Sequence, residues 1–249
     1  MDVTQDWYDG FFEEEWLDYL ALPAGQREEQ QVAFLVEQLG LGDGSRVLDL
    51  ACGRGRIAIP LAQHGCRVTG LDLSPRSLER ARGDAKSAGV ELELIERDMR
   101  ELDAEAAFDA VVNVFSSFGY FPEQSDDERV LAQVARALAP GGQFLIDTIN
   151  TVAIAAEFKP VNWTELEDGT LFLERRRYDH LTGRHEASWT FVRPDGARSE
   201  IRHSMRGYTV PELVRMLDAV GLEVDGAWGS WEGTELGDGT RTILRARKS

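Results

Sequence analysis

Cysteine is scarce in this chain, which carries only Cys52 and Cys66 among its 249 residues. Two thiols cannot form a disulfide framework, and their spacing, with no His or Cys pair to accompany them, fits no common zinc site. Long apolar runs are missing too, since nothing approaches the roughly 18 unbroken apolar residues that a membrane-spanning helix needs. The first residues also lack the basic patch and apolar core of a secretory signal. We therefore expect a cytoplasmic protein with no metal site and no membrane partner.

Basic residues are outnumbered, since 27 Lys and Arg stand against 44 Asp and Glu and give a formal net charge of −17. Such a chain repels phosphate backbones, and a DNA or RNA partner would lose the counterion release that supplies most of its affinity. The acidity serves solubility, or in part the binding of a cationic ligand. We therefore expect no nucleic-acid partner.

Patterns typical of strands and helices alternate between residues 26 and 147. Apolar residues recur at helical spacing in some segments, and short buried runs separate them. Ser74 followed by Pro75 is a natural helix start, because serine caps a helix and proline fits its first position. This alternation predicts a parallel, doubly wound sheet. Helices are expected at residues 26–39, 56–63, 75–88 and 126–138, and strands at 46–50, 67–71, 92–95, 108–114 and 143–147.

A period of two replaces this alternation between residues 163 and 206. Ala187, Trp189 and Phe191 alternate with polar neighbours, and a turn at 193–196 leads to a second alternating run through His203. A helix at 210–220 and strands at 223–224 and 242–244 then follow. We therefore expect an α/β fold with a doubly wound, mostly parallel seven-stranded sheet and an inserted antiparallel β cap. The expected division is an N-terminal segment of residues 1–25, a core of 26–150 and 207–249, and a cap of 151–206.

Residues 47–58, VLDLACGRGRIA, place a glycine turn between a strand and a helix, which is the geometry of dinucleotide-type cofactor sites. Gly53 and Gly55 let the backbone approach a ligand closely, and Ala58 is small enough for the helix to pack on the strand. Asp72 ends the next strand about twenty residues on, where an acid accepts hydrogen bonds from ribose hydroxyls. In this context the pattern predicts a site for an adenosine-containing cofactor.

Asp49 decides between such cofactors. A carboxylate beside the glycine turn repels a pyrophosphate, which needs the bare amide donors of the helix N-terminus. A ligand with an ammonium and a sulfonium gains from the same charge, and S-adenosylmethionine fits, with its ribose toward Asp72 and its amino-acid end toward Asp49. The alternative is that Asp49 only shapes the turn. A nicotinamide-dependent oxidoreductase is a weaker hypothesis, because the chain carries an acid at position 49 and no Tyr-x-x-x-Lys hydride site.

Three further segments accompany the glycine turn and Asp72. They are Arg97-Asp98-Met99 after the third expected strand, FDAVVN at 108–113 and LAPGGQFLI at 138–146. Together the five segments resemble those of class I, Rossmann-like S-adenosylmethionine-dependent methyltransferases, closely over residues 26–147 and more loosely from residue 208 onward. Residues 113–121, NVFSSFGYF, and the β insertion are similar to small-molecule N- or O-methyltransferases with a β cap over the active site.

This resemblance implies S-adenosylmethionine as the cofactor and assigns roles to single residues. Asp98 would hydrogen-bond the adenine amino group, and the Met99 backbone would hydrogen-bond a ring nitrogen. Leu73 and Met99 would sandwich the ring, and residues 113–115 would lie beside the methionine portion. The candidate cofactor-binding residues are Asp49, Ala51, Gly53, Gly55, Asp72, Leu73, Asp98, Met99, Asn113, Phe115 and Tyr8.

The N-terminal segment is rich in aromatic residues, among them Tyr8 and Phe11. In the resembled enzymes such a segment folds over the cofactor, and an aromatic face there attracts the sulfonium. The resemblance therefore implies that residues 1–25 form a lid. The alternative is that these aromatic side chains simply pack on the body of the protein.

Methyl transfer from a sulfonium requires alignment of the nucleophile, the methyl group and the sulfur, and loss of a proton from the nucleophile. His203 on the cap and Asp147 at the carboxyl end of the fifth strand, where doubly wound sheets bind ligands, are the candidate catalytic residues. A buried structural histidine and a turn-capping carboxylate are the alternatives. The candidate substrate residues are Phe118, Tyr120, Asn150, Arg175 and Trp189.

The segment after the fourth strand bears on the methyl acceptor. It reads NVFS and lacks the polar-Pro-Pro-aromatic box that stacks on a flipped nucleic-acid base. We therefore predict methyl transfer to an amine or hydroxyl of a small molecule, by a monomer or a homodimer. The remaining alternative is a non-catalytic protein that binds S-adenosylmethionine or another protein.

Overall fold

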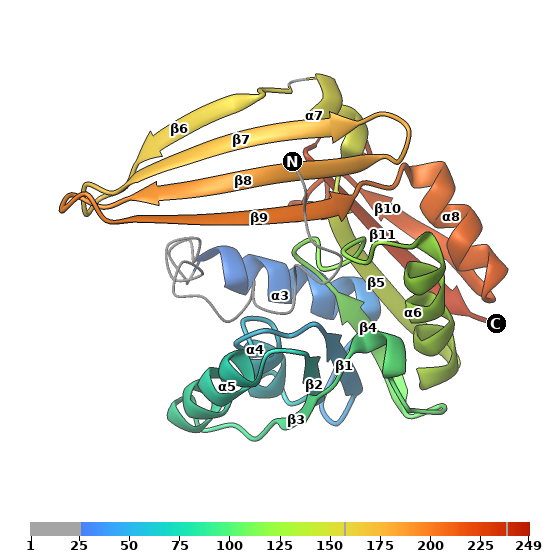
Figure 1. The fold of residues 1–249 in the computed structure, drawn as a ribbon. Coiled ribbons are helices and arrows are strands. Elements are labelled where there is room, and N and C mark those ends of the chain that lie inside the picture. Colours follow the sequence, from blue (N-terminus) through green and yellow to red (C-terminus); the bar gives the residue numbers. More distant parts are fainter. Residues whose placement is uncertain (1–25, 157, 238) are drawn as a thin grey trace.

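Two β-sheets and their helices make up the part of the chain that the computed structural model describes, residues 26–156, 158–237 and 239–249 (Figure 1). The described helices are α3 (Gln26–Leu39), α4 (Ala58–Gln63), α5 (Pro75–Ser87), the short 3-10 helix η1 (Met99–Glu101), α6 (Gln124–Ala137), α7 (Thr151–Ala156) and α8 (Val210–Ala219). The larger sheet contains β1 (Arg46–Leu50), β2 (Arg67–Asp72), β3 (Glu93–Glu96), β4 (Phe108–Asn113), β5 (Leu138–Ile149), β10 (Leu222–Trp228) and β11 (Arg241–Lys248). The smaller sheet contains β6 (Val161–Glu165), β7 (Leu171–Asp179), β8 (Arg184–Val192) and β9 (Arg198–Arg206).

The larger sheet is mostly parallel, with the strand order β10-β11-β5-β4-β1-β2-β3. β1 pairs in parallel with both β2 and β4, and within this sheet β11 is the strand that runs antiparallel to its neighbours. The chain moves outward from β1 toward β3 and then returns to β4 on its other side. The loops after β1 and β4 therefore diverge at the carboxyl edge of the sheet, which is where such folds bind ligands. This arrangement confirms the predicted seven-stranded sheet.

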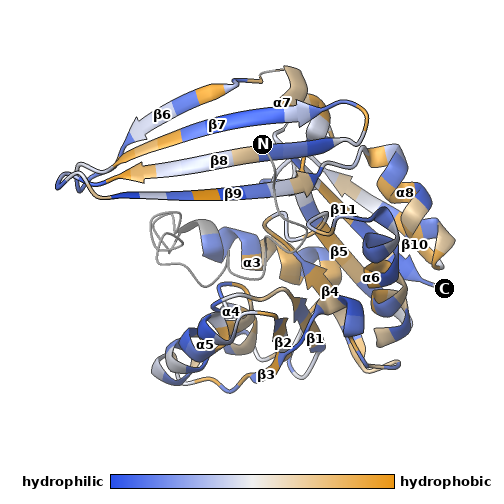
Figure 2. Ribbon diagram, in the orientation of Figure 1, coloured by the Kyte–Doolittle hydropathy of each residue, from blue (hydrophilic) through white to orange (hydrophobic). Residues whose placement is uncertain are grey.

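Helices cover both faces of the larger sheet and bury two apolar layers. One layer joins α6 and α8 to the sheet and contains Leu48, Val130 and Leu213. The other joins α3 and α4 to the opposite face and contains Leu35 and Val47. Val47 and Leu48 are neighbours on β1, so this strand is buried on both sides, as parallel strands usually are. In Figure 2 the central strands β4 and β5 are correspondingly apolar along most of their length.

The smaller sheet is antiparallel, with the order β6-β7-β8-β9, and β9 is mostly hydrophilic in Figure 2. Phe172 lies opposite Phe191 with ring centroids 4.9 Å apart, and the Trp189 ring lies 4.2 Å from the His203 ring. These four side chains share one face of the sheet. The predicted antiparallel insertion is therefore confirmed.

Some elements differ from the sequence expectation. β5 begins at Leu138, five residues before the expected start at 143, because a bulge around Gly141 (φ 75°) lets the chain pair with β4 across an irregular register. β10 continues to Trp228, past a bulge next to Asp225 that interrupts the alternation of apolar residues. α7 and η1 have no counterpart in the predicted pattern, because six and three residues are too few to show a helical period. Among the residues described, no helix has the length and apolar character needed to cross a membrane.

Candidate active site

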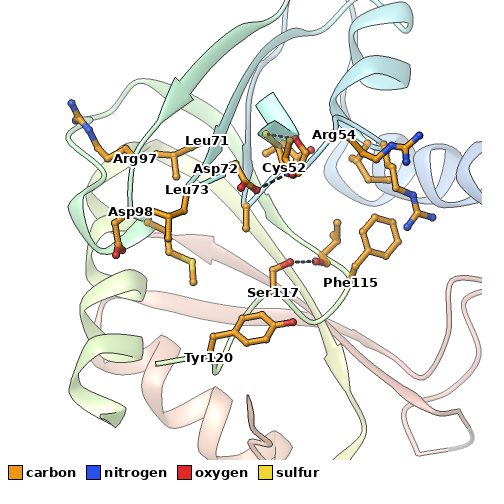
Figure 3. Close-up of a pocket in the computed structure, with 18 of the residues that line it drawn as sticks. Cys52, Arg54, Leu71, Asp72, Leu73, Arg97, Asp98, Phe115, Ser117 and Tyr120 are labelled. Carbon is orange, nitrogen blue, oxygen red and sulfur yellow. Dashed lines mark hydrogen bonds between the residues drawn. The ribbon is translucent and has the colours of Figure 1, made fainter. Parts of the chain in front are cut away.

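A cavity of about 360 Å³ lies at the carboxyl ends of β1, β2 and β4, and its size is in the range of small-molecule sites. Its walls are the glycine turn after β1, the end of β2 with the start of α5, the start of η1, and the loop after β4. Figure 3 shows Leu73, Arg97 and Asp98 toward one end and Arg54 and Phe115 toward the other. The described residues that line it are Asp49, Ala51, Cys52, Gly53, Arg54, Arg56, Ile57, Leu71, Asp72, Leu73, Ser77, Arg97, Asp98, Met99, Val114, Phe115, Ser117, Tyr120 and Phe121.

The glycine turn has left-handed backbone at Ala51 (φ 62°), Gly53 (φ 54°) and Gly55 (φ 81°). A Cβ atom added at Gly53 would meet open space, so a ligand in the cavity can approach this backbone. A Cβ atom added at Gly55 would lie 3.2 Å from the side chain of Ile59, so this glycine allows close packing of α4 on the turn. Of the two predicted glycines, Gly53 lines the cavity and Gly55 does not.

Asp72 ends β2, and two backbone amides hold its carboxylate. Gly53 N donates to Oδ2 at 2.7 Å, and Ser74 N donates to Oδ1 at 2.9 Å. These bonds join the glycine turn to the start of α5, where Ser74 is the N-cap as predicted and accepts from Ser77 N. The Asp72 carboxylate is thus fixed in the wall of the cavity.

Asp49 lies near the end of β1 and is 2% exposed. Burial raises the pKa of Asp49 to about 7, and the negative charge of Asp72 acts in the same direction. A backbone hydrogen bond from Ala58, at the start of α4, opposes this shift. Two carboxylates therefore share one cavity, and either a proton or a cationic ligand relieves their repulsion.

Asp98 and Met99 line the end of the cavity that also contains Leu73. The Asp98 carboxylate caps η1 by accepting from Arg100 N at 2.8 Å, and it also pairs with the Arg100 guanidinium at 2.7 Å. Leu73 is 41% exposed, which is unusual for a leucine at the end of a core strand. The structure thus brings the three residues of the predicted adenine site together, and Arg100 is a further partner of Asp98.

The loop after β4 forms another wall of the cavity. Phe115 and Ser116 are both left-handed, each with φ 61°. The Arg56 guanidinium lies 4.4 Å from the centre of the Phe115 ring and also pairs with Glu28 of α3 at 2.7 Å. Ser117 donates to a carbonyl of the same loop at 2.8 Å, the bond drawn beside Phe115 in Figure 3. The Phe115 ring therefore lies against Arg56 of the glycine turn, and Glu28 of α3 in turn holds the Arg56 guanidinium.

Asp147, a predicted catalytic residue, lies beneath this loop and outside the cavity lining. It is fully buried and pairs with Arg241, whose Nε donates to Oδ1 at 2.7 Å. Its Oδ2 accepts from Phe115 N at 2.8 Å, and its carbonyl accepts from Ser116 N at 3.0 Å. Burial raises the pKa of Asp147, and the charge of Arg241 opposes that effect. All its described contacts are with protein groups.

Three other predicted residues also lie behind the cavity wall. Asn113 is buried and donates from Nδ2 to the carbonyl of Leu50 at 2.9 Å, which ties β4 to β1. Phe118 is 2% exposed because its ring packs in the core, 5.6 Å from the Tyr208 ring. Asn150 accepts a backbone amide of α7 at 3.1 Å and donates to the loop before β11 at 3.0 Å. Tyr120 is the predicted substrate residue that does line the cavity.

The predicted residues of the cap lie on strands that contribute nothing to the described cavity lining. His203 packs against Trp189, and burial lowers the pKa of His203 to about 4, so its imidazole is neutral near pH 7. Arg175 is exposed on β7. Tyr8 and the rest of the predicted lid, residues 1–25, lie outside the described residues.

The cap meets the site through the loop after β4. The Arg184 guanidinium, at the start of β8, donates to the carbonyls of Phe121 at 2.9 Å and Tyr120 at 3.3 Å. Arg206, at the end of β9, donates from its backbone amide to the carbonyl of Gly119 at 2.7 Å. Two strands of the smaller sheet thus hold the backbone of the loop after β4, which includes the lining residues Tyr120 and Phe121.

Several lining residues were not predicted from the sequence, including Arg54, Arg56, Ser117 and Phe121. Arg54 and Arg56 alternate with Gly53 and Gly55 in the glycine turn. Their place in this motif could have predicted that they line the cavity. Ser117 and Phe121 flank predicted residues of the loop after β4, but nothing local in the sequence shows which of those side chains face the ligand.

Comparisons with known proteins identify relatives of this chain. The model of a protein family described as "Methyltransferase domain" matches residues 47–142 of this chain. A relative named "Putative methyltransferase YqeM", from Bacillus subtilis (strain 168), is 31% identical over 85% of this chain and 87% of that protein. "Cypemycin N-terminal methyltransferase", from Streptomyces sp, is 30% identical over 81% of this chain and 82% of that protein. The solved structure of "the sugar N-methyltransferase KedS8", from Streptoalloteichus sp ATCC 53650, superposes with a TM-score of 0.69 at 20% identity, over 100% of this chain and 95% of that one.

The chain therefore belongs to the S-adenosylmethionine-dependent methyltransferases. Its cofactor is S-adenosylmethionine, and it is an enzyme of that family, as the resemblance of its motifs implied. The nicotinamide-dependent and non-catalytic alternatives are thereby set aside.

Proposed function

We propose that this enzyme transfers the methyl group of S-adenosylmethionine to an amine or hydroxyl of a small molecule, and that an amine is the preferred acceptor. The observation that carries the proposal is the chemistry of the cavity: two neighbouring carboxylates, Asp49 and Asp72, in a wall that contains no histidine among its described residues. The name of KedS8 states methylation of a sugar nitrogen, which supports a small-molecule amine for this chain.

The residues present fit the cofactor. Asp72 accepts the ribose hydroxyls, as the acid at the end of the second strand does in related folds. Asp49 offsets the positive charge of the methionine portion, because its carboxylate has no cationic side chain among its strongest electrostatic partners. The open space at Gly53 lets the ligand contact the backbone, and Leu73 and Met99 offer apolar surface to the adenine.

S-adenosylmethionine supplies an electrophilic methyl group on a sulfonium, and the protein has to align the acceptor with it and exclude water. Phe115 and Tyr120 belong to the wall formed by the loop after β4, and we place the acceptor against them. Burial raises the pKa of Tyr120 to about 12, so its hydroxyl stays protonated near pH 7 and donates a hydrogen bond rather than accepting the proton of the acceptor. This favours an amine that binds as the free base, because a hydroxyl acceptor more often needs a base.

A screen with isotopically labelled methyl donor tests the proposal. Three acceptor panels are offered at equal concentration: amino sugars and other small amines, small phenols and alcohols, and peptides with a free N-terminus. We expect label in the small amines. The peptide panel represents the alternative that the name "Cypemycin N-terminal methyltransferase" suggests. Label only in peptides or only in hydroxyl acceptors would contradict the preferred acceptor.

Tyr120→Phe is the matched variant for this screen. It removes the hydroxyl and keeps the ring in the cavity wall. We expect an increase of a few-fold in KM for the amine, about what one neutral hydrogen bond contributes, with little change in cofactor affinity. Tyr178→Phe on β7, away from the cavity lining, is the control.

A further inference from the structure

The loop after β4 has an unusual backbone. Phe115 and Ser116 are consecutive non-glycine residues, and both have a φ of 61° in the left-handed region. Side chains other than glycine rarely adopt this conformation, and such residues persist only where the surroundings determine them strongly. Ser116 is also 7% exposed, so a favourable interaction of its hydroxyl with water does not explain the conformation.

Asp147 supplies the contacts that hold this backbone. Its side chain accepts from Phe115 N at 2.8 Å, and its main-chain carbonyl accepts from Ser116 N at 3.0 Å. One residue of β5 therefore binds both left-handed residues, through two different oxygen atoms. A slight shift of Asp147 would release both amides together.

Arg241 of β11 in turn holds the Asp147 carboxylate. Nε donates to Oδ1 at 2.7 Å, and the guanidinium also approaches Oδ2 at 2.7 Å. The carboxylate is completely buried, and the Arg241 side chain is 25% exposed, so this pair is well shielded from solvent. A paired guanidinium fixes both the position and the orientation of a carboxylate. The charge of Arg241 also acts on Tyr120, a second residue of the same cavity wall.

We propose that Asp147 and Arg241 are positioning residues, which fix Phe115 and Ser116 in their left-handed conformation and so set the cavity wall where cofactor and acceptor meet. The proposal rests on the proposed placement of the cofactor in this cavity. It assigns Asp147 no contact with the reacting atoms, in contrast to the general-base role that its place at the end of β5 suggested. Phe115 transmits the effect, because its ring lines the cavity and stacks on Arg56.

The first experiment measures binding of S-adenosylhomocysteine by calorimetry to Asp147→Asn and Arg241→Gln. We expect both variants to bind about tenfold more weakly, as misplaced contact groups commonly cause, and to retain a cooperative unfolding transition. Asp225→Asn is the matched control, since it breaks the Arg245–Asp225 pair between β10 and β11 (2.6 Å), away from the cavity lining. We expect wild-type affinity for this control. Wild-type affinity in both test variants would overturn the proposal.

The second experiment separates positioning from general-base catalysis. With an accepted amine, positioning predicts altered KM values together with a reduced kcat, and a pH–rate profile of unchanged shape. The opposite result in Asp147→Asn would refute our assignment and show Asp147 to be the base. In that case kcat would fall by more than about a hundredfold, cofactor affinity would be unchanged, and the acidic limb of the pH–rate profile would disappear.

A rescue variant tests the backbone argument directly. Glycine adopts a left-handed φ without steric cost, so Ser116→Gly should restore most of the affinity lost in Asp147→Asn. A double variant that binds no better than Asp147→Asn would overturn the link between Asp147 and the loop backbone. Since S-adenosylhomocysteine binding needs no methyl acceptor, an error in the proposed acceptor leaves this outcome unaffected.

Discussion

The two sheets of this enzyme contribute to its candidate active site in different ways. The lining residues of the described cavity lie in the last two residues of a strand of the larger sheet, in the segment that follows such a strand, or in the next helix. The smaller sheet contributes contacts to backbone carbonyls instead, chiefly those that Arg184 makes to Tyr120 and Phe121. With the cofactor and acceptor placed as we propose, the larger sheet supplies the side chains that recognise the cofactor, and the smaller sheet holds the backbone of the wall on the acceptor side.

This difference predicts a division of phenotypes. Substitutions at the carboxyl edge of the larger sheet should change cofactor affinity, because those side chains line the cavity in which we place the cofactor. Substitutions where the cap meets the loop after β4 should change stability or acceptor kinetics with little effect on cofactor affinity. A substitution at the carboxyl edge that changed only acceptor kinetics, or one in the smaller sheet that strongly weakened cofactor binding, would contradict this difference between the two sheets.

Asp72→Ala should give the largest effect. It removes the acceptor of the Gly53 and Ser74 amides as well as the proposed ribose acceptor. We expect affinity for S-adenosylhomocysteine to fall by about 10- to 150-fold, the equivalent of roughly 1.4–3 kcal/mol. Calorimetry measures this loss, with the exposed Asp84→Ala on α5 as the control. Equal affinities of Asp72→Ala and the control would contradict the site assignment.

Tyr208→Phe should mainly affect stability. The Tyr208 hydroxyl donates to the buried Asp127 carboxylate at 2.6 Å, which joins the segment after β9 to α6. Loss of this donor leaves a buried carboxylate less well satisfied, so we expect the free energy of unfolding at pH 7.5 to fall by about 1–3 kcal/mol.

The pH dependence sharpens this prediction. Burial raises the pKa of Asp127 to about 6. Below that value the carboxyl is protonated in the folded state, and the missing donor matters less. Urea unfolding at pH 5 should therefore show a smaller difference between Tyr208→Phe and wild type than at pH 7.5. A difference that grows toward pH 5, or a large change in cofactor affinity, would argue against the assigned role.

Arg184→Gln is the next test and addresses acceptor kinetics. It removes the guanidinium bonds to the carbonyls of Tyr120 and Phe121 and to Ser204. We expect kcat/KM for the acceptor to fall about fivefold, near 1 kcal/mol, through KM more than through kcat. Arg202→Gln is the control, because Arg202 is exposed on β9 and pairs with Glu200. Weaker binding of S-adenosylhomocysteine to Arg184→Gln than to Arg202→Gln would contradict the claim that the smaller sheet has little effect on cofactor affinity.

The two regions also differ in how far the sequence predicts them. The alternation of strands and helices and the glycine turn are local patterns, and they predicted the sheet, the Ser74 cap, and Gly53 and Asp72 in the cavity wall. The resemblance to methyltransferase motifs added Leu73, Asp98 and Met99, which line the same cavity. Gly55 shows the limit of a motif, since the same pattern does not tell a glycine that contacts a ligand from one that packs against Ile59.

The acceptor side depends on contacts between residues far apart in the chain. Asp147 and Phe115 are 32 positions apart, and Arg184 and Tyr120 are 64 apart. No local period encodes such pairs, so a sequence argument can place Asp147 at the correct edge of the sheet without showing that it faces a loop. Phe118 illustrates the same point, because its ring packs in the core beside Tyr208, a residue far along the chain.

The last predicted effect, similar in size to that of Arg184→Gln, concerns the charge of Asp49. Its pKa of about 7 means that the unliganded protein carries a proton on this carboxyl below that pH. The unfolded value is near 3.9, so the folded state binds the extra proton between about pH 4 and 7, and its stability should decrease as the pH rises through that window. A cationic ligand favours the ionised carboxylate, so its binding should release a proton and strengthen with rising pH.

We therefore expect affinity for S-adenosylmethionine to increase about fivefold between pH 5.5 and 7.5, as measured by calorimetry in buffers of different ionisation enthalpy. Adenosine lacks the ammonium and the sulfonium, so its affinity should be nearly independent of pH. Asp49→Asn should abolish the dependence for S-adenosylmethionine, whereas Asp84→Asn should preserve it. Equal pH dependence for the two ligands would show that Asp49 does not respond to the ligand charge, and its role would then be limited to shaping the turn through Ala58.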